Sequence, residues 1–245
     1  MTPEGLERHN EQQRRYFSRG IKPRMVPRGA PHIQRQLDEL IRFAGIQPRH
    51  LILDAGCGMG RYTLPLAERG LRVEGLDLTP FLLDQLRQAD GGRFQIPLYC
   101  ADLIHHPPDL TGRYDFIVGF FTLHHLHDFT ACYRGMWRML KPGGQVVFLE
   151  PNAYNPLFYL QILITPGMTW EGDKGMGLMR RSILFPAMRE AGFTDLRLER
   201  FGFLPPVLYN RRWGPRLDAV LETVPLWRSL RPYQLIAGVK PGLRA

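Results

Sequence analysis

The sequence has few cysteines, and none of them is placed to form a cross-link or a zinc site. The three cysteines, Cys57, Cys100 and Cys132, are an odd number, lie far apart and form no Cys-X-X-Cys pair. This argues against a disulfide-stabilised secreted scaffold and against a structural zinc site. The 245 residues are enough to bury a full hydrophobic core without such supports.

Long hydrophobic runs are also missing. The longest, PLFYLQILITPGM at residues 156–168, is shorter than the roughly 20 residues that span a bilayer. The first residues, MTPEGLERHNEQQRRYF, are polar and charged and contain no apolar segment of a secretory signal. We therefore expect a cytoplasmic protein without a transmembrane segment.

Negative charge is scarce at both ends of the sequence. Residues 1–50 hold ten Lys and Arg against five Asp and Glu, and residues 197–245 hold nine against three. The residues between them are slightly acidic, with thirteen Lys and Arg against fifteen Asp and Glu. Two interpretations stay open: the flanks meet an anionic group, or arginine-rich helices keep the surface soluble.

From residue 51 onward, short apolar or β-branched runs alternate with helical patterns, which is typical of a parallel sheet covered by helices. The predicted strands are residues 51–54, 72–77, 94–100, 114–120, 144–150, 195–203 and 233–239. The predicted helices between the first five strands are residues 60–69, 80–89 and 127–140. Pro97 lies inside the third run and favours an edge strand there.

The first strand runs into a glycine-rich turn, LILDAGCGMGRY, at residues 51–62. Its Gly56, Gly58 and Gly60 are spaced GxGxG, and Arg61 stands where a dinucleotide fingerprint has its third glycine. The carboxylate of Asp54 would repel a pyrophosphate in this turn. The turn instead suits a ligand with a cation, an amino-acid group and no phosphate, such as S-adenosylmethionine.

Five motifs together carry a resemblance to a known family: LDAGCGMG, VEGLDLTP, CADL, YDFIVGFFTLHHL and MLKPGGQVVFLEPN. In this order, over residues 45–150, the chain resembles the class I S-adenosylmethionine-dependent methyltransferases that act on small molecules. The resemblance implies an α/β fold: a Rossmann-like, seven-stranded, mostly parallel sheet with helices on both faces and a helical cap. It also implies S-adenosylmethionine as the cofactor.

The resemblance suggests a role for each part of the chain. Residues 1–44 are expected to form an N-terminal helical lid, and residues 45–150 the S-adenosylmethionine-binding core. Residues 151–178 would form an acceptor-site insertion. Residues 179–245 would complete the sheet, with a helical cap inserted at 204–231. The added segments are expected to gather over the carboxyl ends of the strands, where open α/β sheets bind ligands.

The same resemblance assigns a set of cofactor-binding residues. The methionine moiety is expected beside the acidic residue and glycines of the turn, the ribose at the carboxylate that ends the second strand, and the adenine between two leucines. The full set is Asp54, Gly56, Cys57, Gly58, Arg61, Tyr62, Asp77, Leu78, Asp102, Leu103, Gly119 and Phe120. Asp102 would accept the adenine amino group, although an N-cap of a helix starting at LIHHPP is an alternative.

Catalytic candidates follow the fourth and fifth strands. His124 and His125 lie just past the fourth strand, and either would serve as a general base if the acceptor must lose a proton. Packing against the next helix is the alternative for either histidine. Glu150 ends the fifth strand and is expected to face the acceptor pocket, unless it caps a turn. No metal site is expected, because adjacent histidines point apart.

The acceptor-binding candidates are aromatic and basic residues of the flanking segments, namely Tyr16, Phe17, Tyr154, Phe158, Trp170, Arg211 and Trp213. A plain core role is the alternative for Tyr16 and Phe17. The set predicts a small-molecule acceptor with an apolar body and a polar or anionic end: a lipid, isoprenoid, quinone precursor or natural product.

Two other functions stay open. The basic flanks would suit an RNA methyltransferase, but FFTLHHL replaces the Asn/Asp-Pro-Pro-Tyr motif of many base-modifying relatives, and no separate RNA-binding module is visible. A catalytically inactive, nucleoside-binding homologue is the second alternative. Peripheral membrane contact and the oligomeric state are left undetermined by the sequence.

Overall fold

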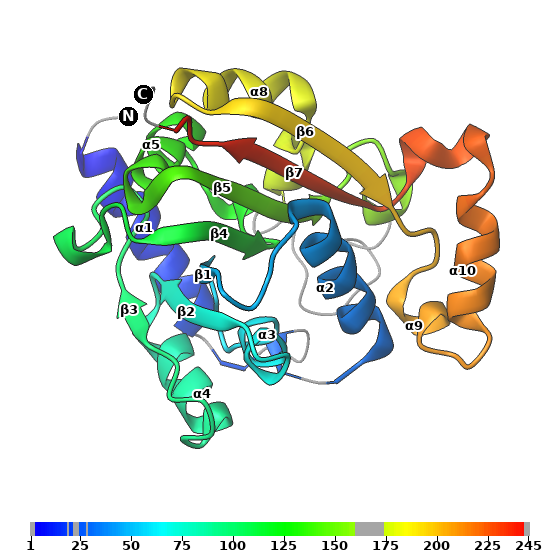
Figure 1. Cartoon of the computed structure of the whole chain (residues 1–245), viewed down its shortest axis with the longest axis horizontal. Coiled ribbons are helices and arrows are strands. Elements are labelled where there is room, and N and C mark those ends of the chain that lie inside the picture. Colours follow the sequence, from blue (N-terminus) through cyan, green and yellow to red (C-terminus); the bar gives the residue numbers. More distant parts are fainter. Residues whose placement is uncertain (1–2, 19, 22–24, 28, 160–173, 243–245) are drawn as a thin grey trace.

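The computed structural model describes residues 3–18, 20–21, 25–27, 29–159 and 174–242. Its centre is a seven-stranded sheet with helices on both faces and the strand order β3-β2-β1-β4-β5-β7-β6 (Figure 1). The strands are β1 Leu51–Ala55, β2 Arg72–Asp77, β3 Leu98–Cys100, β4 Tyr114–Phe120, β5 Leu140–Pro151, β6 Thr194–Phe201 and β7 Tyr233–Val239.

Strands β1 to β5 pair in parallel, whereas β7 lies antiparallel between β5 and β6. The seven-stranded, mostly parallel sheet is therefore confirmed. Because the first five strands point the same way, their carboxyl ends and the turns that follow β1, β2, β3 and β4 share one edge.

Helices α2 Pro31–Ala44 and α3 Thr63–Glu68 cover one face of the sheet. The side chains of Ile33, Leu37 and Leu40 are buried in a cluster with Ile52 and Phe116 of the strands. Their spacing of three and four residues puts them on one face of α2, so burial of this stripe fixes the helix against the sheet.

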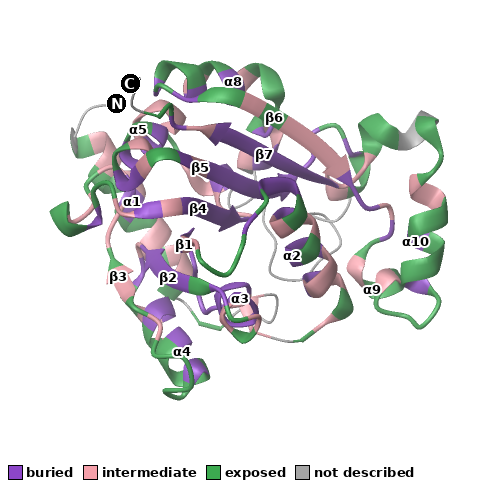
Figure 2. Cartoon of the chain, viewed as in Figure 1, coloured by how far each residue is buried: buried purple, intermediate pink, exposed green. Residues whose placement is uncertain are grey.

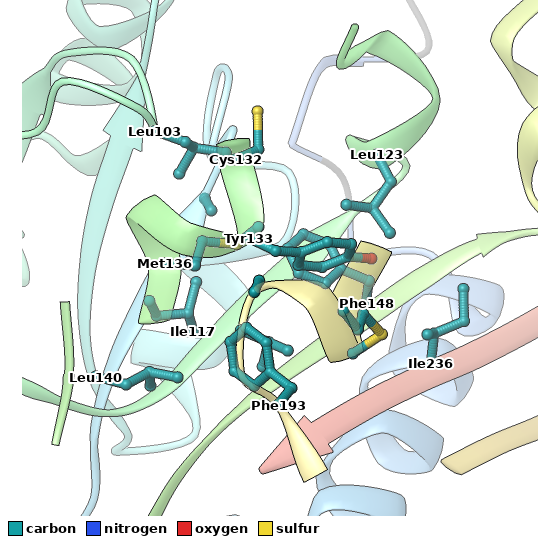
Figure 3. Packing of buried hydrophobic residues seen from close by; sticks show 14 of the residues in the cluster. Leu103, Ile117, Leu123, Cys132, Tyr133, Met136, Leu140, Phe148, Phe193 and Ile236 are labelled. Carbon is teal, nitrogen blue, oxygen red and sulfur yellow. The ribbon is translucent and has the colours of Figure 1, made fainter. Parts of the chain in front are cut away.

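The opposite face is covered by α5 Phe129–Met139 and α8 Arg181–Glu190. Figure 3 shows Tyr133 and Met136 of α5 packed against Ile117 and Phe148 of the strands, with Phe193 beside them. Asp128 caps the start of α5, because its side chain accepts a hydrogen bond from the Ala131 amide at 2.9 Å.

Two elements of the structure differ from the sequence predictions. The third strand is shorter than predicted because Asp90 binds the amides of Phe94 and Gln95 at 3.1 and 3.0 Å, which takes residues 94–97 out of the strand. As predicted, β3 is an edge strand. Helix α8 was not predicted, and it contains Pro186 in its interior.

The remaining described helices are α1 Pro3–Ser18, α4 Pro80–Asp90, α9 Pro206–Tyr209, α10 Gly214–Glu222 and the short 3₁₀ helices Pro108–Leu110, Leu123–His125, Lys174–Leu178 and Pro225–Leu230. Helix α4 packs on β2 and β3, and Pro108–Leu110 lies before the start of β4. Helices α9 and α10 project at one end of the molecule, and α10 is largely exposed (Figures 1 and 2). Within the described residues, no helix has both the length and the hydrophobicity needed to cross a membrane.

Candidate active site

A cavity of about 520 Å³ lies at the carboxyl edge of the sheet. Its walls come from the turns that follow β1, β2, β3 and β4, together with side chains of α1 and α2. From α1 the lining residues are Leu6, His9, Asn10, Gln13 and Phe17. Helix α1 therefore covers the cavity, whereas α2 mainly packs on the sheet and contributes only His32 and Gln36.

The glycine-rich turn is fixed to the end of β2 by backbone hydrogen bonds. The amides of Gly56 and Cys57 donate to the Leu76 carbonyl at 2.7 and 3.1 Å. Gly56 has a φ of +77°, and a Cβ at this position would lie 2.5 Å from Cγ2 of Thr122. Both the backbone conformation and the space therefore require glycine here.

Asp54 lies beneath this turn with a carboxylate that is only half satisfied. Its Oδ2 accepts a hydrogen bond from Oγ1 of Thr63 at 2.6 Å, whereas Oδ1 is buried and has no hydrogen-bond partner among the described residues. Burial, with a further contribution from Asp77, raises the pKa of Asp54 to about 7. A cationic ligand would satisfy this oxygen, so the residues present fit the ammonium-bearing S-adenosylmethionine.

Asp77 ends β2 and also lines the cavity. Its Oδ2 accepts a hydrogen bond from the Gly58 amide at 2.9 Å, and its Oδ1 accepts one from the Thr79 amide at 2.8 Å. Burial raises its pKa, and these backbone donors oppose the rise. Because each carboxylate oxygen has two lone pairs, Asp77 retains capacity to accept further hydrogen bonds, as binding of ribose hydroxyls requires.

Asp102 caps a turn, and no helix begins directly after it, so the alternative of a helix N-cap was wrong. Its Oδ1 accepts hydrogen bonds from the amides of Ile104 and His105 at 2.7 and 2.6 Å. Its Oδ2 lies 3.5 Å from Nδ2 of Asn10, which links the turn to α1. Asp102, Leu78 and Leu103 all line the cavity, so an adenine-binding role stays a prediction beside the structural one.

Arg61 and Tyr62 line the cavity from the far side of the glycine turn. The Tyr62 hydroxyl donates to Oε1 of Gln36 at 2.7 Å, and its ring stacks on Phe120 with 4.1 Å between ring centroids. Nη2 of Arg61 lies 3.0 Å from Nε2 of His32.

Gly119, the neighbour of Phe120 on β4, does not line the cavity. A Cβ at Gly119 would lie 2.3 Å from the Phe148 ring, so the close packing of β4 on β5 requires glycine at this position.

His124 and Glu150 form a buried pair at the cavity wall. Nδ1 of His124 lies 2.8 Å from Oε2 of Glu150, while Oε1 of Glu150 accepts hydrogen bonds from the amides of Thr122 and Leu123 at 2.7 and 2.6 Å. Glu150 is fully buried and does not line the cavity, so the prediction that it faces the acceptor pocket was wrong. Its carboxylate oxygens instead accept hydrogen bonds from the turn that follows β4.

His125 also lines the cavity and contacts the covering helix α1. Nε2 of His9 lies 3.1 Å from the His125 carbonyl oxygen, and the Phe17 ring packs edge-to-face on the His125 ring at 5.3 Å. The Phe17 prediction thus falls on a residue that does line the cavity, whereas Tyr16 packs on Phe17 outside the lining.

The other acceptor candidates are not all brought to the cavity. Phe158 lines it, but Tyr154 is about half exposed and does not. Arg211 and Trp213 are exposed near the start of α10 and lie outside the lining. Trp170 falls outside the described residues.

Sequence reasoning expected a helical lid over residues 1–44 but missed four of its polar residues that line the cavity. His9 and Asn10 on α1, and His32 and Gln36 on α2, line the cavity. His32 and Gln36 are four residues apart, so they share one side of the helix; this spacing was the signal in the sequence.

The chain was compared with known families and proteins. Residues 52–144 match the model of a methyltransferase domain family. Ubiquinone biosynthesis O-methyltransferase of Pseudomonas entomophila is 32% identical over 131 residues, which cover 52% of this chain and 53% of the relative. The protein of the same name from Pseudomonas putida is 33% identical over the same length. The chain thus spans about half the length of the curated relatives it matches.

Solved structures share the fold across more of the chain. Geranyl diphosphate C-methyltransferase of Streptomyces coelicolor, solved with S-adenosylhomocysteine, has a TM-score of 0.64 at 19% identity and covers 98% of this chain and 99% of its own. Phosphoethanolamine N-methyltransferase 2 of Haemonchus contortus, solved with S-adenosylmethionine, has a TM-score of 0.59 at 17% identity; the match covers 85% of this chain and 52% of that one. Residues 52–144 are therefore a methyltransferase domain, and the chain has the fold of the class I S-adenosylmethionine-dependent methyltransferases.

Proposed function

We propose that the protein transfers a methyl group from S-adenosylmethionine to a hydroxyl group of a small molecule with an apolar body. The observation that carries the proposal is that His124, hydrogen-bonded to the buried Glu150, lines the same cavity as the half-satisfied carboxylate of Asp54. His124 would remove a proton from the acceptor, and Asp54 would hold the cation of the donor. When bound, S-adenosylmethionine supplies an electrophilic methyl group that is transferred by direct displacement.

The hydrogen bonds of Glu150 determine which nitrogen of His124 accepts a proton. An ionised carboxylate only accepts hydrogen bonds, so Nδ1 of His124 carries the hydrogen that points to Oε2 of Glu150. Nε2 is then the basic nitrogen of the ring. Glu150 also holds the amides of Thr122 and Leu123, so it fixes the ring and its backbone together. His124 is thus placed and polarised as a general base, with Glu150 as its positioning residue.

Binding of the donor is assigned to the glycine turn and its two carboxylates. Oδ1 of Asp54 would pair with the ligand cation, and Asp77 would accept hydrogen bonds from the ribose hydroxyls. Helix α1 would act as the lid, because it covers the cavity and contacts the turns that follow three strands. Arg14 donates to the Leu78 carbonyl at 3.4 Å, Asn10 faces Asp102, and His9 faces the His125 carbonyl. A closed lid excludes water from the reacting groups.

The class of acceptor rests on the lining and on the relatives. Phe17, Phe121, Phe158, Met176 and Tyr233 give the cavity an apolar and aromatic wall. An acceptor hydroxyl must lose a proton, which gives His124 a function. The curated relatives are named ubiquinone biosynthesis O-methyltransferase, and one structural neighbour is a geranyl diphosphate methyltransferase. These support a quinone precursor or isoprenoid-like acceptor.

The test is methyl transfer from labelled S-adenosylmethionine to catechol-bearing quinone precursors. His124→Ala is expected to lower kcat by about 100-fold or more with little change in donor affinity measured by calorimetry. Glu150→Gln is expected to lower kcat and to shift the pH profile, because the single amide oxygen of glutamine cannot accept hydrogen bonds both from the amides of Thr122 and Leu123 and from Nδ1 of His124. His50→Ala, at the opposite end of the sheet, is the matched control and should retain full activity.

Three outcomes would contradict the proposal. Near-normal turnover of His124→Ala would assign that histidine to packing. Tight donor binding without label in any acceptor, when metabolite and RNA fractions are also tested, would favour the inactive nucleoside-binding homologue. Label in the RNA fraction would reverse the choice of acceptor.

A further inference from the structure

The segment that contains α9 and α10 exposes an unusual amount of apolar surface. Of the twelve large hydrophobic side chains exposed in the described part of the chain, seven lie between residues 207 and 230. The most exposed are Val207 at 71%, Val220 at 62% and Trp213 at 50%. Exposed apolar side chains gathered in one short segment mark an interaction site rather than ordinary surface.

Helix α10 is amphipathic, but it exposes its apolar face and buries its polar face, the opposite of an ordinary surface helix. Trp213 at the N-cap, Leu217 and Val220 are spaced four and three residues apart, so they form one stripe, and all three are exposed. Val224, two residues after the end of the helix, is exposed as well. The polar face of the helix is turned inward. Buried Asp218 accepts hydrogen bonds from the amides of Phe203 and Leu204 at 2.9 and 2.7 Å.

Glu222 is held inward in the same way. It accepts a hydrogen bond from the Gly202 amide and pairs with Arg35 at 2.8 Å. Asp218 and Glu222 are the only acidic residues between positions 204 and 231. Both are therefore engaged with the protein, and neither offers its charge on the outer face of α10.

The exposed charges of this segment are all positive. Arg211, Arg212, Arg216 and Arg228 are exposed and have no exposed carboxylate among residues 204–231. Helical spacing places Arg216 one turn before Val220, beside the apolar stripe. We call the stripe and these four arginines the α10 surface. Apolar side chains flanked by arginines match an anionic lipid interface, where the chains enter the acyl boundary and the guanidinium groups meet phosphates.

We propose that the α10 surface docks the protein on an anionic phospholipid bilayer. A second copy of the chain is a poor occupant, because a symmetric contact through this surface would oppose arginines to arginines. Nucleic acid would engage the arginines but leave the aliphatic stripe in water. Only a surface with both phosphates and an apolar interior complements all of these side chains.

The position of the α10 surface near the cavity links membrane docking to acceptor binding. Pro206 lines the cavity, and the exposed Val207 and Leu208 follow it directly in α9. Exposed apolar side chains of α9 therefore lie between the cavity wall and the α10 surface, because α9 contacts α10. An apolar acceptor dissolved in the bilayer would reach the cavity without crossing bulk water. Vesicle binding needs neither donor nor acceptor, so it tests the α10 surface independently of the proposed methyl transfer.

The experiment is flotation of the purified chain with vesicles of equal parts phosphatidylcholine and phosphatidylglycerol, compared with vesicles of phosphatidylcholine alone. Binding is expected only with the anionic vesicles, and it should weaken at high salt. Arg212→Glu with Arg216→Glu should lower the partition coefficient by on the order of 100-fold, because two favourable charges become unfavourable. Leu217→Ser with Val220→Ser should lower it by about tenfold or more.

The matched control is Arg49→Glu with Arg72→Glu, which makes the same charge change on exposed arginines at the opposite edge of the sheet. This variant should bind anionic vesicles as the unaltered chain does, within about a few-fold. Equal losses in the control and in the Arg212/Arg216 variant would reduce the effect to net charge and overturn the proposal. Light scattering that shows a dimer lost in the Leu217/Val220 variant, without vesicle binding, would assign the α10 surface to self-association instead.

Discussion

The buried carboxyl group of Asp54 predicts how donor binding depends on pH. Its pKa of about 7 means that the group is largely protonated at pH 5 and ionised at pH 8. Binding of a cation requires the ionised form. If only that form binds, about 1% of the protein is competent at pH 5, so the affinity should be on the order of 100-fold weaker there than at pH 8.

The assay is isothermal calorimetry with S-adenosylmethionine at pH 5, 6, 7 and 8 in two buffers that differ in ionisation enthalpy. The wild-type protein should release about one proton on binding at pH 5 to 6, and close to none at pH 8. Asp54→Asn should bind weakly, with a flat dependence on pH. Asp84→Asn, which removes an exposed carboxylate of α4, is the control and should keep the wild-type slope.

The stability of the ligand-free protein should change in the opposite direction. The folded-state pKa of Asp54 is raised above its ordinary value of 3.8, so the folded protein holds a proton that the unfolded chain releases. The associated stability is present below about pH 4 and is lost as the pH rises through about 7, by on the order of 4 kcal/mol. Asp54→Asn should remove this loss. An affinity that does not vary with pH in the wild type, or a slope that persists in Asp54→Asn, would refute the reasoning.

Two further predictions concern backbone and capping. Gly56→Ala should destabilise the fold by more than Gly112→Ala in urea denaturation, because both have positive φ but only Gly56 has no space for a Cβ. The control should lose about 1 kcal/mol, and an equal loss at both sites would mean that Thr122 moves aside freely. Asp218→Ala should leave two backbone amides without partners and cost about 2–4 kcal/mol. Hydrogen exchange should show faster exchange at Phe203 and Leu204, and unchanged protection there would contradict the assigned capping role.

Much of the fold could be predicted from the sequence because its signals are local. The bounds of β2, β4 and β7 match the predicted runs, since buried apolar segments bounded by polar residues read as strands. The shortening of β3 depends on the Asp90 carboxylate reaching amides beyond its helix, which no periodicity reveals. Helix α8 was not predicted. Pro186 is unfavourable inside a helix, whereas burial of Leu184, Phe185 and Met188 in the core holds α8 against the sheet.

Some residues of the candidate site could also be predicted from the sequence, and others could not. The glycine turn and its carboxylates could be predicted, because positions of positive φ favour glycine and the ends of strands can be located from the apolar runs. The partner of Glu150 could not, since it depends on how the turn after β4 folds back over β5. A helical lid over residues 1–44 was expected, but its polar lining residues were not identified. His9 and Asn10 are ordinary polar residues of a charged helix until tertiary contacts bring them over the cavity.

The place of β7 in the sheet has a consequence for how the chain is made. Within the described residues β6 pairs only with β7, and β7 alone joins it to β5. During synthesis β5 and β6 both emerge before β7, so two strand edges with open hydrogen-bonding groups wait for the same late segment. A chain whose synthesis stops after β6 and before β7 would have an incomplete sheet with two unpaired strand edges, which are prone to aggregate. We expect chaperone binding to matter most during this interval.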